Sequence, residues 1–216
     1  MGLREIKKSQ LKLSFLEAAL ELLKKEPFEK IKVLDICHRV GTSEVTFFKY
    51  FRRKEEILQF FMLVWDFKRT QRLKREGFQR GLSGLYAIFD DIAKTDNALG
   101  IMIAFVSFIA SQREKPASIK LEPSDKELVV PGYIQDETEE DLDQQMARLV
   151  REAIVDGEIR DDARIDELIK VLSGIFYGVP LITHATSGDD LGGDYLSSLH
   201  FVFEAISIKR GYESED

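Results

Sequence analysis

A cluster of hydroxyl, acidic and basic side chains between residues 41 and 54 has the chemistry to contact DNA. Thr46 offers a hydroxyl to any base edge and a methyl group to thymine, and Glu44 could accept a hydrogen bond from a cytosine amino group. Lys54 lies where a new helix is expected to begin, so its ammonium and the free amides there could together hold one phosphate. An acid in the first turn of a helix also favours the helix dipole and repels phosphate, so helix stabilisation is the preferred interpretation of Glu44.

The cluster lies in a predicted helix-turn-helix. Residues 32–40 and 43–50 are each predicted to form a short helix, and Gly41 between them can adopt the left-handed conformation that ends a helix. Thr42 or Ser43 then offers a hydroxyl that caps the second helix. A helix-turn-helix places this second helix in the major groove of DNA, where its first residues face base edges and flanking residues contact phosphates.

A preceding helix completes a small predicted head. Apolar residues recur at steps of three and four within residues 9–25, which indicates an amphipathic helix, and Pro27 ends it. Phe47 and Phe51, four residues apart, are expected to pack in the core of this head. A long helix with a new apolar period is expected to follow from about Ile57.

At the level of individual residues, the sequence resembles the TetR family of transcriptional regulators. The resemblance rests on Phe15–Ala19, Val33, Asp35–Ile36, Gly41–Ser43, Thr46–Phe51 and Lys54–Leu58. Independently, Leu149–Arg160 looks like the end of the seventh helix that is common in that family. The resemblance implies a homodimer of all-α subunits, each with a three-helix DNA-binding head, residues 1–54, and a six-helix body for ligand binding and dimerisation, residues 55–216.

The resemblance also implies roles for individual residues of the head. Phe48 departs from the family pattern, which usually has a tyrosine whose hydroxyl often meets a phosphate, and Lys49, Arg52 and Arg53 are the cations that could replace this contact. The groove-facing positions of the family fall on residues 42–46, and its phosphate contacts fall on Tyr50 and Lys54. The predicted DNA-binding residues are Thr42, Ser43, Glu44, Val45, Thr46, Phe48, Lys49, Tyr50 and Lys54.

Charge is distributed unevenly along the 216 residues, whose net charge is −7. Residues 1–80 contain 19 basic and 11 acidic side chains, whereas residues 81–216 contain 12 basic and 27 acidic ones. Polyanion binding is therefore expected only in the N-terminal part. A single cysteine, an N-terminus without the apolar core of a signal peptide, and the lack of an uncharged run of eighteen apolar residues predict a cytoplasmic protein with no membrane segment.

The remainder of the chain reads as mostly helical, with one long loop. Residues 116–140 contain three prolines and have no helical period, which favours a loop. Apolar periodicity predicts helices over about 85–93, 99–110, 139–157, 165–183 and 193–209.

The body is predicted to bind a small apolar or aromatic effector and to dimerise. In the TetR family the last two helices, here about 165–184 and 193–209, form a four-helix dimer interface. Ordinary core packing is the alternative explanation for the aromatic residues of the body. The predicted ligand-binding residues are Phe89, Met102, Phe105, Phe108, Ile109, Phe176 and Tyr177.

The favoured function is a transcriptional repressor that binds a pseudo-palindromic double-stranded operator and is released by its effector. No cofactor, metal site or catalytic residue is predicted, because the three histidines lie far apart and Ser173 stands outside any nucleophile-elbow motif. An alternative is a ligand-binding or interaction protein with a degenerate DNA-binding head, which Phe48 and the sparse base-reading chemistry suggest. An enzyme is the third and least favoured hypothesis.

Overall fold

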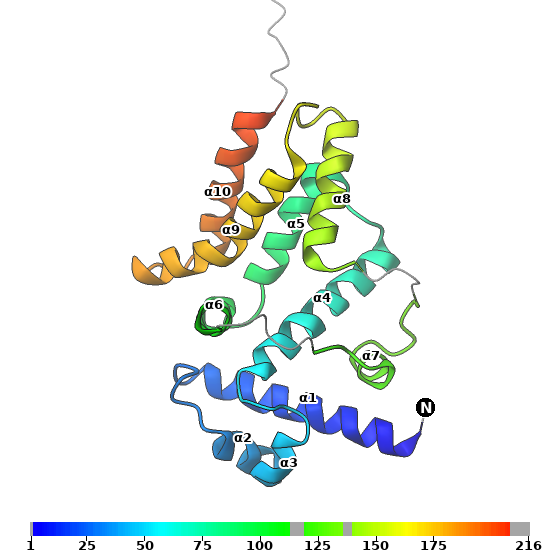
Figure 1. Ribbon diagram of the computed structural model, residues 1–216, viewed down its shortest axis with the longest axis vertical. Coiled ribbons are helices and arrows are strands. Elements are labelled where there is room, and N and C mark those ends of the chain that lie inside the picture. The colour runs from blue at the N-terminus through cyan, green and yellow to red at the C-terminus, as the bar shows by residue number, and fades with distance from the viewer. Residues whose placement is uncertain (1, 113–118, 136–139, 208–216) are drawn as a thin grey trace, which may run out of the picture. The chain divides into compact units, whose positions relative to one another are not determined.

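The protein is all-α, as the sequence predicts (Figure 1). The computed structural model describes residues 2–112, 119–135 and 140–207. Within these ranges the regular elements are ten helices, and one isolated antiparallel bridge joins Ile159 to Ser207. The helices are α1 (Leu3–Leu23), α2 (Val33–Val40), α3 (Glu44–Phe48), α4 (Glu56–Glu76), α5 (Gly81–Ala93), α6 (Ala98–Ser111), α7 (Pro123–Val129), α8 (Leu142–Val155), α9 (Ile165–Ala185) and α10 (Leu191–Ile206).

The structure corrects the predicted loop over residues 116–140, because α7 forms inside it. Seven helices rather than six therefore follow the three helices of the head in the described part of the chain. Pro123 begins α7 at a position where a missing N–H costs nothing, and the Asp125 carboxylate accepts a 2.9 Å bond from the Glu122 amide. A helix of seven residues is too short to give a periodic signal. Residues 116–118 and 136–139 of the predicted loop, and 208–209 of the predicted last helix, lie outside the described residues.

The chain forms two compact units. The first unit comprises residues 1–76 and 95–136, with α1 to α4, α6 and α7, and the second comprises residues 77–94 and 137–216, with α5 and α8 to α10. These bounds describe packing within the chain. The predicted functional division into a head, 1–54, and a body, 55–216, stays a prediction.

Four phenylalanine rings form the centre of the first unit. The four rings are all completely buried: Phe15 of α1, Phe47 of α3, Phe51 between α3 and α4, and Phe60 of α4. Phe47 lies edge-on to Phe15 with ring centroids 5.2 Å apart, and Phe51 lies 5.8 Å from Phe60. The expected core packing of Phe47 and Phe51 is therefore confirmed, and this cluster fixes α3 against α1 and α4.

A polar junction between α1 and α7 lies in the same unit, and we call Ser9, Lys12, Ser124 and Asp125 the α1–α7 junction. Ser9 and Ser124 share a 2.8 Å hydrogen bond, and Lys12 pairs with Asp125. The Lys12 ammonium also lies 4.6 Å from the centroid of the Phe60 ring. All four residues of the junction are buried, so α7 holds the first helix of the head through desolvated polar contacts.

The second unit is a bundle in which α5, α8, α9 and α10 lie side by side (Figure 1). Its centre holds Phe89 of α5, Phe176 of α9 and Tyr195 of α10, with the Phe89 ring 5.5 Å from Phe176 and 5.2 Å from Tyr195. The Tyr195 hydroxyl donates a 2.7 Å hydrogen bond to the Phe176 carbonyl. Burial raises the pKa of Tyr195 above its ordinary value, which keeps this hydroxyl protonated as a donor.

Candidate nucleic-acid interface

The turn between α2 and α3 has the geometry that its sequence predicts. Gly41 ends α2 in the left-handed region with φ of 74°, and the Thr42 amide donates to the Cys37 carbonyl at 3.0 Å. Ser43 caps α3, because its hydroxyl accepts from the Thr46 amide at 3.4 Å. The predicted cap is therefore confirmed at Ser43, and the two helices take up a helix-turn-helix arrangement (Figure 1).

One side of α3 is exposed and the other is anchored in the core. Glu44, Val45, Phe48 and Lys49 are exposed, while Phe47 between them is completely buried. Ser43 is also exposed, and Thr42 and Thr46 are partly buried. The structure thus brings the predicted groove-facing residues together around the first turn of one short helix.

Tyr50 and Lys54 occupy more enclosed positions than the groove-facing residues. The Tyr50 ring is partly buried and lies 6.2 Å from the Phe15 ring. The Lys54 ammonium donates hydrogen bonds to the Phe28 carbonyl at 2.6 Å and to the Ile31 carbonyl at 2.7 Å. Two of its three donors therefore stabilise the turn between α1 and α2, a role that sequence reasoning missed.

The surroundings of Lys54 disfavour its charge on balance. Burial lowers the pKa of its ammonium, although Glu55 and Glu29 nearby partly oppose this effect. Its ammonium also lies 4.5 Å from the centroid of the Phe28 ring. The predicted phosphate contact of Lys54 stays a prediction, and it would compete with the Glu29 carbonyl, which accepts from the same ammonium at 3.5 Å.

Lysine replacements are expected to separate these two roles. Lys54→Met should lower the free energy of unfolding by about 1–3 kcal/mol, because it leaves two partly buried carbonyls without their donor. Lys49→Met is the matched control, since Lys49 is exposed and should change the salt dependence of DNA binding by a slope of about 0.9 with little loss of stability. Urea unfolding and affinity measurements at several salt concentrations test both. Lys54→Met with unchanged stability and a reduced slope would contradict the internal role.

The α1–α7 junction is a further feature of the first unit that sequence reasoning did not find. Ser9 and Lys12 lie three residues apart on α1 and continue the buried face of Leu16, Ala19 and Leu23. The signal in the sequence that could have revealed this junction is Lys12, a lysine on the apolar side of an amphipathic helix. Its partner Asp125 lies in the segment that was predicted as a loop.

The predicted ligand-binding residues fall into two groups, one in each unit. Phe89, Phe176 and Tyr177 lie together in the second unit, where the Phe176 and Tyr177 centroids are 5.1 Å apart. The pKa of Tyr177 is raised to about 12, mainly by burial and further by the nearby carboxylates of Asp143 and Asp141. The remaining four lie on α6 in the first unit, three of them buried and Ile109 40% exposed: Met102, Phe105, Phe108 and Ile109.

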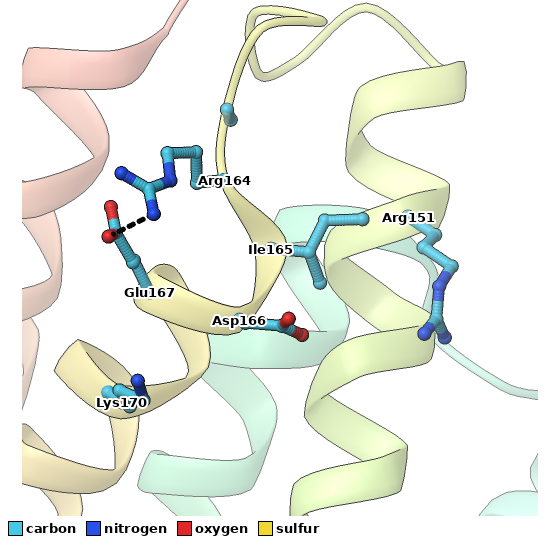
Figure 2. Close-up of a pocket in the computed structure, with 7 residues that line it drawn as sticks. Arg151, Arg164, Ile165, Asp166, Glu167 and Lys170 are labelled. Carbon is cyan, nitrogen blue, oxygen red and sulfur yellow. Dashed lines mark ion pairs between the residues drawn. The ribbon is translucent and has the colours of Figure 1, made fainter.

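A surface hollow of about 550 Å³ lies in the second unit, at the start of α9 (Figure 2). Figure 2 shows its charged side chains, with Arg151 contributed by α8 and with Arg164 paired to Glu167 at 2.7 Å. None of the predicted ligand-binding residues lines it, so it lends no support to that prediction. Its lining residues are Arg151, Ala163, Arg164, Ile165, Asp166, Glu167 and Lys170.

The capped turn, the exposed first turn of α3 and the basic N-terminal part together define a helix-turn-helix DNA-binding protein. Residues 15–59 match the sequence profile of bacterial regulatory proteins of the tetR family. The match covers the helix-turn-helix head, which is therefore a DNA-binding domain of the tetR type. No curated protein has a sequence that matches this chain.

Solved structures share the fold over nearly the whole chain. Thermus thermophilus FadR, a TetR-family transcriptional repressor crystallised with lauroyl-CoA, is 18% identical with a TM-score of 0.59, over 93% of this chain and 97% of that one. A candidate transcriptional regulator from Saccharomonospora viridis, crystallised with choline, is 18% identical with a TM-score of 0.60, over 93% and 100%. A candidate fatty acid metabolism regulator from Clostridium perfringens is 17% identical with a TM-score of 0.51, over 91% and 100%. The resemblance of fold and the prediction of a TetR-type regulator are confirmed.

Proposed function

We propose that this regulator is a dimeric repressor that binds a pseudo-palindromic operator and leaves it when a small apolar or aromatic molecule binds. The observation that carries the proposal is the helix-turn-helix, with its left-handed Gly41 and its Ser43 cap, inside the segment that matches the family profile. In this proposal residues 42–46 face base edges, while Lys49, Tyr50 and Lys54 contact the DNA backbone. Exposed Arg39 and Arg52 add positive charge to the head.

The proposed dimer forms through α9 and α10, as the predicted segments 165–184 and 193–209 imply. Helix α9 is long and apolar enough to match a membrane span. Only 33% of its most apolar window is buried within the chain. Added Cβ atoms at Gly174 and Gly178 would meet nothing within 4 Å, so packing inside the chain does not require these glycines. A second copy would use the close approach that they allow. Exposed apolar side chains on the two helices are Val171, Leu181, Ile182, Leu196 and Phe201.

The proposed effector acts through α6, whose fourteen residues carry no charge. The guanidinium of Arg53, which follows α3 in the head, lies 5.6 Å from the Phe108 ring of α6. At the other end of α6, the Asn97 side chain donates to the Leu23 carbonyl at 3.1 Å. A ligand that displaces α6 would thus move Arg53 and the Leu23 end of α1, which both belong to the head. Relatives of this fold crystallised with lauroyl-CoA and with choline, so both are suitable first probes.

Selection of operator fragments from random DNA at two salt concentrations tests the proposal. We expect a pseudo-palindromic site whose preference over bulk DNA survives the higher salt concentration, because base contacts depend on salt less than phosphate contacts do. An effector should then lower operator affinity by about 5- to 150-fold, the usual range of coupling between two sites. Fluorescence anisotropy of labelled operator measures both effects. A protein that never prefers a sequence would instead support the ligand-binding protein with a degenerate head.

A further inference from the structure

The outward face of α3 carries two largely exposed apolar side chains. Val45 is 70% exposed and Phe48 is 48% exposed. Residues three apart on a helix lie on the same face, so Val45 and Phe48 stand next to each other. Together they form what we call the apolar reading face.

The polar groups around this face are mostly engaged within the chain. The Ser43 hydroxyl accepts from the Thr46 amide and lies 3.1 Å from the Thr46 hydroxyl. Residues 42–48 contain no arginine, lysine, asparagine or glutamine, the side chains that most often read base edges by paired hydrogen bonds. The exposed carboxylate of Glu44 is the remaining strong acceptor on this turn. Hydrogen bonds alone therefore provide little base discrimination here.

The Phe48 ring is held in place from behind. It lies edge-on to the Phe47 ring, with centroids 5.3 Å apart and planes at 85°. Phe47 is completely buried between Phe15 and Phe51. A ring braced in this way loses little conformational freedom when it contacts a partner, which suits it for recognition.

The exposed cations next to the apolar reading face indicate the partner. Lys49 and Arg52 follow it in the chain and are exposed, as is Arg39 at the end of α2. These charges complement the phosphates of a duplex. The apolar group that a major groove presents at its base edges is the 5-methyl group of thymine.

We propose that Val45 and Phe48 read thymine 5-methyl groups in the operator. The proposal rests on the operator binding proposed above and names the base that the head selects. The phenylalanine at position 48, which removes a hydroxyl expected at the phosphate backbone, gains a role as an apolar contact. Loss of one buried methyl group should weaken binding about fourfold, and its loss from both half-sites about 15-fold.

Replacing single thymines by deoxyuridine in the selected operator tests this inference, because the change removes the methyl group and leaves base pairing intact. With the full-length protein, we expect at least one thymine in each half-site to show the fourfold loss. Val45→Ala or Phe48→Ala should abolish the sensitivity at the thymine that the residue contacts. Val45→Ala shortens a side chain that is 70% exposed and should fold normally, so it keeps the test decisive if Phe48→Ala does not fold. Lys49→Met is the matched control, which should weaken binding but keep the sensitivity to deoxyuridine.

Three results would overturn the inference in distinguishable ways. Operator affinity that stays within twofold at every deoxyuridine would refute methyl reading while operator binding stands. Sensitivity that persists in Val45→Ala and in folded Phe48→Ala would assign the methyl contacts to other residues. A protein with no preference for any selected sequence would overturn the inference together with the proposed function.

Discussion

Replacement of Asp125 by alanine is expected to lower the free energy of unfolding by about 3–5 kcal/mol, as is typical when one partner of a buried ion pair is removed. The exposed fraction of the side chain is 6% for Lys12 and 0% for Asp125. Without the carboxylate, the ammonium of Lys12 would remain buried beside the Phe60 ring with no opposite charge. The Glu122 amide at the start of α7 would also lose its acceptor. Urea unfolding monitored by circular dichroism measures the loss.

Two further variants identify the cause of this expected loss. The double replacement Lys12→Met with Asp125→Leu should be as stable as the original protein or more stable, because it leaves no charge buried. Lys8→Ala removes the neighbouring pair with Glu122, whose side chains are each 42% exposed, and should cost at most about 1 kcal/mol. If Asp125→Ala costs no more than Lys8→Ala, the Lys12–Asp125 pair is not desolvated in solution. Operator affinity of the double variant then tells whether the charge itself matters for DNA binding.

Introduction of a charge at Ile182 is expected to convert the proposed dimer into monomers and to weaken operator binding about 10²- to 10⁴-fold, since two linked heads gain that much from binding together. Ile182 is 65% exposed on the apolar side of α9. A glutamate there would lose its water in a dimer interface, whereas in the monomer it stays solvated. Sedimentation analysis gives the oligomeric state of Ile182→Glu, and anisotropy gives its operator affinity.

Controls for the dimer prediction come from the same unit. Val155 at the end of α8 is 80% exposed, so Val155→Glu places an equal charge on a surface that is not proposed to dimerise. Gly178→Leu offers a second disruption, because its Cβ meets open space within the chain and leucine favours a helix more than glycine does. The variant should fold well and still fail to dimerise. An unchanged dimer in both Ile182→Glu and Gly178→Leu would place the interface elsewhere.

Prediction from sequence succeeded where the signals were local. The left-handed Gly41 and the Ser43 cap act on backbone groups within a few residues, and the burial of Phe47 and Phe51 follows from their spacing of four residues. The prediction of a loop over residues 116–140 was wrong because α7 is short and is held by contacts with α1. Its capping by Asp125 is visible only once the helix is known to exist.

The sequence by itself determined the all-α class, the helix-turn-helix and its resemblance to TetR regulators, because helix periodicity, caps and motif spacing are properties of neighbouring residues. Only the tertiary structure decided that Lys12 is a buried partner of Asp125, 113 residues away, and that Lys54 holds the carbonyls of the α1–α2 turn. The physical reason is desolvation. A lysine on a helix is equally plausible in water or in an ion pair, and the choice depends on which distant segment covers it.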